Sequence, residues 1–106
     1  MTLPQLIREG ITMTQQLSRH GRTAMRYWEI YRPRALQQLG DQEAFFRALD
    51  LNVTEQIGTL TDEMLSLMPP RQRPTARTAT RAQATEIVYA ERIWLPKEPG
   101  TEHLEM

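Results

Sequence analysis

The sequence predicts an all-α protein, a small bundle of three to four helices. Apolar residues recur at the three- and four-residue spacing of one helix face, and proline or glycine separates the segments that show this spacing. A chain of 106 residues without cysteine has the length of one domain and must be held together by its core, because no disulfide can form. We expect a single helical domain over residues 1–96, with residues 1–12 as a loose extension.

A short helix is predicted from Thr2 toward Leu17, and a longer one over residues 22–39. In the longer helix the apolar residues gather within about 80° of one another at 100° per residue. Trp28 lies on this apolar side and is expected in the core. Pro33 lies inside the helix and removes a backbone donor, so we expect a kink or a break near Pro33, at Tyr31–Arg32.

Two further helices are predicted in the middle of the chain, over residues 41–49 and from Asn52 or Thr54 to Met68. Asp41 is the expected N-cap of the first. The second has one apolar stripe, which resembles a coiled-coil seam over two heptads and suits packing inside the domain or a helical dimer. The stripe consists of Val53, Ile57, Leu60, Met64, Leu67 and Met68.

Three prolines and two arginines in residues 69–75 predict an extended linker. A last helix is predicted from Ala76 through Leu95. Its second half is apolar nearly all round, which suits burial on several sides or a subunit interface, although its β-branched and aromatic residues also permit a strand. Residues 97–106 are predicted to be a disordered acidic tail.

Thirteen basic and thirteen acidic residues cancel, yet they are segregated along the chain. Residues 19–34 hold five arginines against one glutamate, and residues 71–81 hold four arginines and no acid. Residues 41–63 hold six acids against one arginine, and the chain from Glu86 onward holds five acids against two basic residues. These blocks either pair inside the fold or present faces of opposite sign to partners.

The basic blocks supply the candidate nucleic-acid-binding residues. On the predicted helix, Arg19, Arg22 and Arg26 lie opposite the side that holds Trp28, where they would contact successive phosphates. Tyr27 lies beside them and would stack or hydrogen-bond there. The full set is Arg19, Arg22, Arg26, Arg32, Arg34, Arg71, Arg73, Arg77 and Arg81, and the candidate protein-interface residues are Glu55, Asp62, Ile87 and Trp94.

No enzymatic chemistry is expected from the sequence. His20 and His103 are far apart and no cysteine accompanies them, so no metal-ligand set and no cofactor site are recognised. The glycines are isolated and form no phosphate loop, and nothing in the local sequence activates a serine. Because neither a membrane span nor a signal peptide is recognised, a cytoplasmic protein without a membrane partner is expected.

Several short motifs resemble the TnpV-like family of transposon-encoded proteins. Residues 20–22 (His-Gly-Arg), 26–27 (Arg-Tyr) and 31–33 (Tyr-Arg-Pro) resemble that family's glycine–arginine and arginine–proline signature. Its closing motif is matched by Ala84, Glu86, Ile87, Val88, Glu91 and Ile93. The resemblance covers residues 20–93 and implies a helical fold and a mobile genetic element. It transfers no catalytic residues.

These observations favour a small, non-enzymatic binding protein of a mobile element that contacts nucleic acid or a nucleoprotein complex through its arginines. An alternative is an anti-defence inhibitor, similar in action to an anti-CRISPR protein, whose acidic face around Glu55 and Asp62 would block a host nucleic-acid-binding enzyme. A third interpretation is an oligomer subunit, such as a homodimer, joined through residues 53–68 or 86–95.

Overall fold

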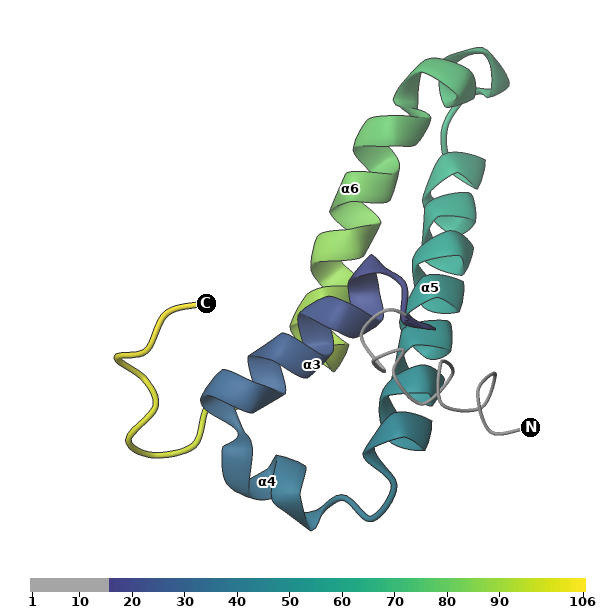
Figure 1. Ribbon diagram of the computed structural model, residues 1–106. Coiled ribbons are helices and arrows are strands. Elements are labelled where there is room, and N and C mark those ends of the chain that lie inside the picture. Colours follow the sequence, from purple (N-terminus) through teal and green to yellow (C-terminus); the bar gives the residue numbers. More distant parts are fainter. Residues whose placement is uncertain (1–15) are drawn as a thin grey trace, which may run out of the picture.

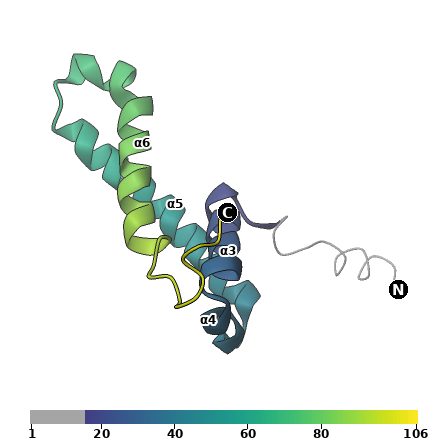
Figure 2. The same cartoon turned by 90° about the vertical axis from the view of Figure 1, so that its left-hand side faces the viewer.

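The computed structural model describes residues 16–106, which contain helices and no strand. The elements are α3 (Arg19–Tyr31), α4 (Pro33–Gln38), α5 (Gln42–Ser66), the 3₁₀ helix η1 (Pro70–Gln72) and α6 (Arg73–Arg92). α5 and α6 form a long antiparallel hairpin, and α3 packs against its lower half (Figures 1 and 2). The predicted all-α bundle is confirmed. The helix predicted from Thr2 and the extension over residues 1–12 lie outside the described residues, apart from the helix's last residues.

Of the kink or break predicted near Pro33, the structure shows a complete break between two helices. α3 ends at Tyr31 and α4 begins at Pro33. Proline is tolerated at the first position of a helix because the N–H of that residue would have no acceptor within the helix. Arg32 between them has a non-helical backbone with φ −136° and ψ 47°. Its guanidinium lies 4.6 Å from the centre of the Trp28 ring, so it covers the outer side of a buried aromatic.

The hydrophobic core lies where α3 meets the lower half of the α5–α6 hairpin. Trp28 is buried there, as predicted, with its ring 5.1 Å from Phe45 and 5.8 Å from Phe46. Tyr27, which was predicted beside the basic residues, is also buried. The core residues are Leu17, Ala24, Tyr27, Trp28, Tyr31, Phe46, Val53, Ile57, Ala84, Val88 and Ile93. Each large side chain buried here contributes roughly 1.5–3 kcal/mol.

α5 is one continuous helix, so the prediction of two helices over residues 41–68 was wrong. No proline or glycine separates residues 49 and 52, and Asp50 and Val53 are both buried against the rest of the fold. Tertiary packing of the residues before and after Asn52 therefore outweighs the weak helix propensity of Asn52 itself. The predicted seam is only partly internal, since Leu67 lies beyond the helix end with 87% of its surface exposed.

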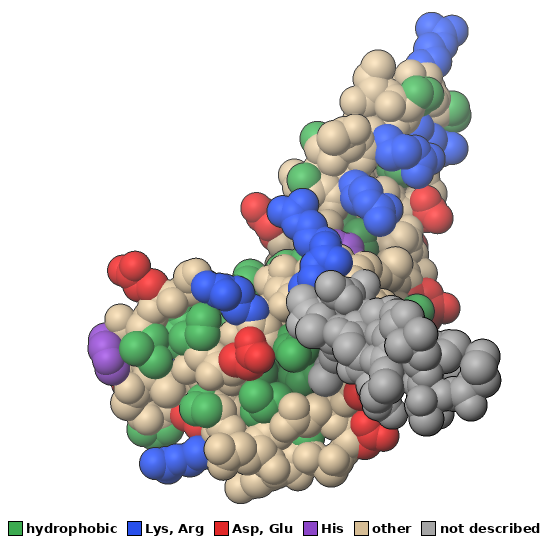
Figure 3. Space-filling view, in the orientation of Figure 1, with side chains coloured by type: hydrophobic (Ala, Val, Ile, Leu, Met, Phe, Trp, Pro, Cys, Tyr) green, Lys and Arg blue, Asp and Glu red, His purple; other side chains and the backbone are tan. Residues whose placement is uncertain are grey.

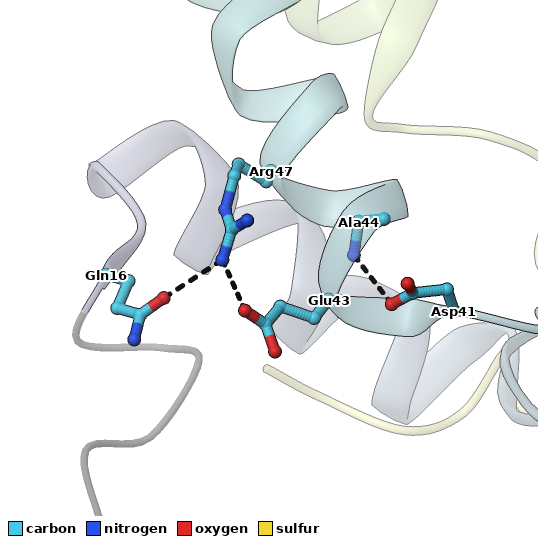
Figure 4. A network of polar contacts seen from close by, with 5 residues as sticks. All are labelled: Gln16, Asp41, Glu43, Ala44 and Arg47. Atoms are coloured by element: carbon cyan, nitrogen blue, oxygen red, sulfur yellow. Dashed lines mark hydrogen bonds and ion pairs between the residues drawn. The ribbon is translucent and has the colours of Figure 1, made fainter. Parts of the chain in front are cut away.

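The N-terminal end of α5 has the cap that was predicted. The Asp41 carboxylate accepts a hydrogen bond from the Ala44 N–H at 3.0 Å (Figure 4). One turn further on, the Arg47 guanidinium contacts both the Glu43 carboxylate and the side-chain oxygen of Gln16 (Figure 4). Exposed pairs of this kind contribute little, typically about 0.2–1 kcal/mol.

Residues 69–75 form a tight helical turn, so the prediction of an extended linker was wrong. η1 occupies Pro70–Gln72, and α6 begins at Arg73. Pro74 lies in the first turn of α6, where its missing N–H is tolerated. The Arg73 guanidinium holds the turn by donating to the Met68 carbonyl at 3.1 Å and the Ser66 carbonyl at 3.2 Å. α6 ends at Arg92, so residues 86–92 are helical and not a strand, whereas the prediction that this helix begins at Ala76 and continues through Leu95 was wrong at both ends.

The N-terminal end of α3 is held by a buried carboxylate from α5. Asp50, with 8% of its surface exposed, accepts hydrogen bonds from the Ser18 N–H at 2.7 Å, the Gly21 N–H at 3.0 Å and the Ser18 hydroxyl. Ser18 is itself the N-cap and accepts from the His20 N–H at 3.3 Å. A negative charge here also interacts favourably with the helix dipole. α3 and α5 are therefore joined by hydrogen bonds as well as by apolar contacts.

Residues 93–106 fold back along α3, so the prediction of a disordered tail was wrong. The Tyr27 hydroxyl donates to the Leu95 carbonyl at 2.6 Å, and the Tyr31 hydroxyl donates to the Leu104 carbonyl at 2.6 Å. Both tyrosine rings lie in the core, so each hydroxyl at the edge of the core binds the returning chain. The polar composition of residues 97–106 predicts a solvated, disordered chain. The two tyrosine hydroxyl groups, which are fixed by the core, hold the segment in place by hydrogen bonds.

Glu98 links this segment to α4. Its carboxylate accepts from the Arg34 N–H at 3.0 Å and the Ala35 N–H at 2.8 Å, in the first turn of α4, and its own N–H donates to the Tyr31 carbonyl at 2.8 Å. Partial burial of the carboxylate opposes ionisation. The two N–H donors and the charges of Arg34 and Arg32 outweigh it, and the pKa of Glu98 is lowered. Glu98 thus supplies the N-terminal cap that Arg32 does not provide.

Gly21→Ala is expected to destabilise the protein by about 1–3 kcal/mol, because the new Cβ would lie 2.8 Å from Asp50 Cβ and Cγ. Gly58→Ala is the matched control. It lies inside α5 with no atom within 4 Å of the added Cβ, and removing a helical glycine is worth about 0.5–1 kcal/mol in stability. Urea denaturation followed by circular dichroism measures both. Equal effects of the two substitutions would contradict the close approach of α3 and α5.

Glu98→Ala is expected to lower the midpoint of thermal unfolding at pH 7, whereas Glu105→Ala, at an exposed position in the same segment, leaves it unchanged. The folded-state pKa of Glu98 is below its ordinary value of 4.5. Its contribution to stability is therefore complete above pH 4.5 and is lost as the pH falls through the folded-state pKa. The difference between wild type and Glu98→Ala should shrink over that range. A constant difference would contradict the role of the ionised carboxylate.

Candidate functional site

Four of the nine candidate arginines donate hydrogen bonds to carbonyl groups of their own chain. Arg22 donates to Leu17 (2.8 Å), Arg26 to Met106 (3.0 Å), Arg32 to Pro96 (2.7 Å), and Arg73 to Met68 and Ser66 (3.1 and 3.2 Å). Carbonyl oxygens do not neutralise a guanidinium, but they hold its position. The side chains of Arg22 and Arg26 therefore serve partly as structural contacts of α3. Arg34 and Arg71 are exposed at separate places.

The other three candidate arginines, Arg19 of α3 with Arg77 and Arg81 of α6, line one surface hollow of about 570 Å³. We call it the basic hollow; its lining residues are Arg19, His20, Arg77, Thr78, Arg81, Ala82, Thr85 and Tyr89. Figure 3 shows a row of basic side chains along this side of the molecule, with a histidine visible among them. The hollow thus draws its arginines from both basic blocks of the sequence.

The three arginines of the basic hollow are nearly free of internal neutralisation. Within residues 16–106, the guanidinium groups of Arg19 and Arg81 have neither an ion pair nor a hydrogen bond. Arg77 lies 3.6 Å from an Asp62 oxygen, and both side chains are mostly exposed, at 61% and 75%. Such a pair is weak and readily exchanged for another anion. The hollow therefore presents positive charge to an incoming ligand.

Two neutral polar side chains complete the hollow. His20 Nδ1 lies 2.6 Å from the Tyr89 hydroxyl, and the rings meet edge to face with their centres 5.5 Å apart. Burial lowers the pKa of His20, and the nearby charges of Arg81 and Arg19 lower it further, against the opposing effect of Asp50. Burial likewise raises the pKa of Tyr89. Both groups are therefore uncharged at pH 7 and act there as hydrogen-bonding groups.

Sequence reasoning did not include His20 or Tyr89 among the site residues. A signal was present in α6, because Arg77, Arg81, Thr85 and Tyr89 follow one another at four-residue intervals and so lie on one helix face. No comparable signal joins that face to Arg19 and His20. Their meeting depends on the packing of α3 against the hairpin.

A second hollow, of about 500 Å³, lies between α5 and α6 and carries acidic residues. We call it the acidic groove; its lining residues are Asn52, Glu55, Gln56, Thr59, Leu60, Glu63, Ile87, Val88 and Glu91. Six helical steps separate Arg81 from Ile87, which places the two hollows about 120° apart around α6. Ile87 is 44% exposed, and Asn52 Oδ1 is buried without a hydrogen-bond donor among the described residues.

The four candidate interface residues do not form one surface. Glu55 and Ile87 line the acidic groove, whereas Asp62 contacts Arg77 of the basic hollow. Trp94 lies just after α6. The centre of its ring is 5.2 Å from that of Tyr27 and 5.5 Å from that of Tyr89, and the residue is partly exposed. The structure therefore divides the predicted acidic face between two neighbourhoods.

Among residues 16–106, no group of three or more acidic or histidine side chains is arranged to hold a metal ion. No helix in that part of the chain combines the length and apolarity needed to cross a membrane. Comparisons with protein-family models, curated proteins and solved structures find no match to this chain. Function is therefore inferred from geometry and chemistry, and the TnpV-like resemblance stays a prediction.

The His20 pKa, measured by proton NMR titration, is expected below 6.5 in the wild type. Arg81→Gln should raise it by removing a nearby positive charge, and Arg71→Gln, a substitution outside the hollow, should not change it. Because the unfolded chain binds this proton more readily, His20 should reduce stability as the pH falls below about 6.5. His20→Gln should weaken that pH dependence. A pKa at or above 6.5 would contradict the burial of His20 beside two arginines.

Proposed function

We propose that this protein binds nucleic acid, and that the basic hollow is the surface that contacts the phosphates. The observation that carries the proposal is that Arg19, Arg77 and Arg81 line one hollow with only an exposed, weakly paired carboxylate beside them. Guanidinium groups suit phosphate because their planar N–H groups match pairs of phosphate oxygens. The proposal assigns the protein a binding role and no catalytic one.

The setting we propose is a mobile genetic element, on the strength of the TnpV-like resemblance. Several residues that carry this resemblance have structural roles. Gly21 permits the approach of α3 to Asp50, while Ala84, Val88 and Ile93 lie in the core. His20 lines the basic hollow. In that setting, the ligand we propose is nucleic acid or a nucleoprotein complex.

The acidic groove supports a second candidate function, inhibition of a host nucleic-acid-binding enzyme. Three carboxylates, from Glu55, Glu63 and Glu91, surround a groove that also exposes Ile87. This groove would suit a basic, partly apolar surface of the enzyme.

Fluorescence anisotropy with labelled DNA and RNA at several salt concentrations tests the leading proposal. The triple substitution Arg19→Gln, Arg77→Gln and Arg81→Gln should weaken binding strongly. It should also reduce the slope of log K against log salt by about 2–3, since each phosphate contact contributes about 0.7–0.9. The control is Arg34→Gln with Arg71→Gln, which removes two exposed arginines outside the hollow.

Equal losses in the control and the triple variant would contradict the assignment to the hollow, and absent binding by the wild type would contradict nucleic-acid binding itself. A pull-down from nuclease-treated lysate then addresses the second candidate. A protein partner retained after nuclease treatment, and lost on neutralising Glu55, Glu63 and Glu91 to Gln, would support inhibition through the acidic groove.

A further inference from the structure

We propose that the basic hollow is a pocket for a terminal phosphate, the phosphate monoester at one end of a nucleic-acid strand. This inference rests on the proposed function and specifies which part of the nucleic acid enters the hollow. It follows from the number of positive charges around the hollow, from its size, and from the neutral donors beside the charges.

The charge around the hollow matches a monoester better than an internal phosphate. A monoester carries about −1.5 to −2 charges near pH 7 and presents three terminal oxygens. An internal diester carries one charge, so a strand's interior is best matched by arginines spread along its length. Arg19, Arg77 and Arg81 instead line one hollow. The nearest carboxylate among the described residues is the exposed Asp62, 3.6 Å from Arg77 and outside the lining. Three cations around one cavity suit one ligand of high charge.

The size of the hollow is sufficient for the end of a strand. About 570 Å³ lies within the range of pockets that enclose small ligands, roughly 300–1,000 Å³. A terminal nucleotide therefore fits in it. Residues of α3 and α6 line the hollow, which is open to solvent, so a strand end can enter it. A strand end in the hollow would lie beside His20 and Tyr89.

The His20–Tyr89 pair supplies one neutral donor when the Tyr89 hydroxyl donates to His20. If the Tyr89 hydroxyl donates to His20 Nδ1, the proton of neutral His20 lies on Nε2. If Nδ1–H donates instead, the Tyr89 hydroxyl keeps its own proton, and the Thr23 side chain, with which Tyr89 also forms a hydrogen bond, competes for it. The Thr78 hydroxyl lines the same hollow and is not used by another described residue, so it adds a further donor. The three oxygens of a monoester can therefore be met by charged and neutral donors together.

The experiment compares one single-stranded oligonucleotide in three forms: with a 5′-phosphate, with a 3′-phosphate, and with hydroxyl groups at both ends, each carrying the same internal fluorophore. We expect one phosphorylated form to bind about 10–100-fold more tightly than the hydroxyl form, the effect of one strong set of charge-assisted hydrogen bonds. Arg81→Gln should abolish this preference, and Arg71→Gln should preserve it. The preference should also fall between pH 7.5 and 5.5, as the monoester takes up its second proton near pH 6.

The outcomes separate this inference from the proposed function. Equal binding of all three forms, weakened alike by Arg81→Gln, would overturn the terminal-phosphate pocket and leave nucleic-acid binding in place. Binding of none of them would overturn the proposed function. Competition with a mononucleotide and with inorganic phosphate identifies the source of the phosphate. If either free ligand binds as tightly as the phosphorylated strand, the pocket holds a small phosphate ligand and the strand-end assignment is wrong. All variants are checked by circular dichroism, and their side chains are exposed, so loss of fold is not expected to produce these results.

Discussion

The capping of α3 by Asp50 is the interaction on which the rest of the structure depends. It places a buried carboxylate of α5 under the first turn of α3, and Gly21 removes the side chain that would keep the helices apart. The same turn carries Arg19 and His20 to the surface of α6, where His20 meets Tyr89. A buried carboxylate is tolerated because three hydrogen bonds satisfy it. One contact thereby sets both the helix packing and the geometry of the basic hollow.

A second constraint comes from the returning C-terminal segment. Tyr27 and Tyr31 extend from the core and bind backbone carbonyls of residues 95 and 104. This segment also uses donors of Arg26 and Arg32, which bind the carbonyls of residues 106 and 96. The side of α3 that was predicted to face a ligand is therefore partly occupied by the chain itself. The positive surface that remains lies at the α3–α6 hollow.

The charged blocks of the sequence form few ion pairs inside the fold and mostly present their charge at the surface. Internal pairing among the described residues is limited to the exposed contacts Arg47–Glu43 and Arg77–Asp62. The buried acid, Asp50, is satisfied by backbone and hydroxyl donors and has no arginine partner within residues 16–106. Most of the segregated charge consequently stays at the surface, with basic and acidic hollows on different sides of α6. Ligands of either sign would meet a surface of opposite charge.

The sequence by itself determined the all-α class, the break at Pro33, the cap at Asp41 and the burial of Trp28. These features follow from interactions within about four residues or from a continuous periodic pattern. Only the tertiary structure decided that residues 41–68 hold one helix, that residues 93–106 are ordered, and that Arg19 joins Arg77 and Arg81. Those outcomes depend on contacts such as His20–Tyr89, 69 residues apart, which no local pattern encodes. The burial of Asp50 and Val53 outweighs the weak helix propensity of Asn52, so α5 is continuous. The tyrosine hydroxyl donors outweigh the tendency of the polar C-terminal segment to remain solvated, so that segment is ordered.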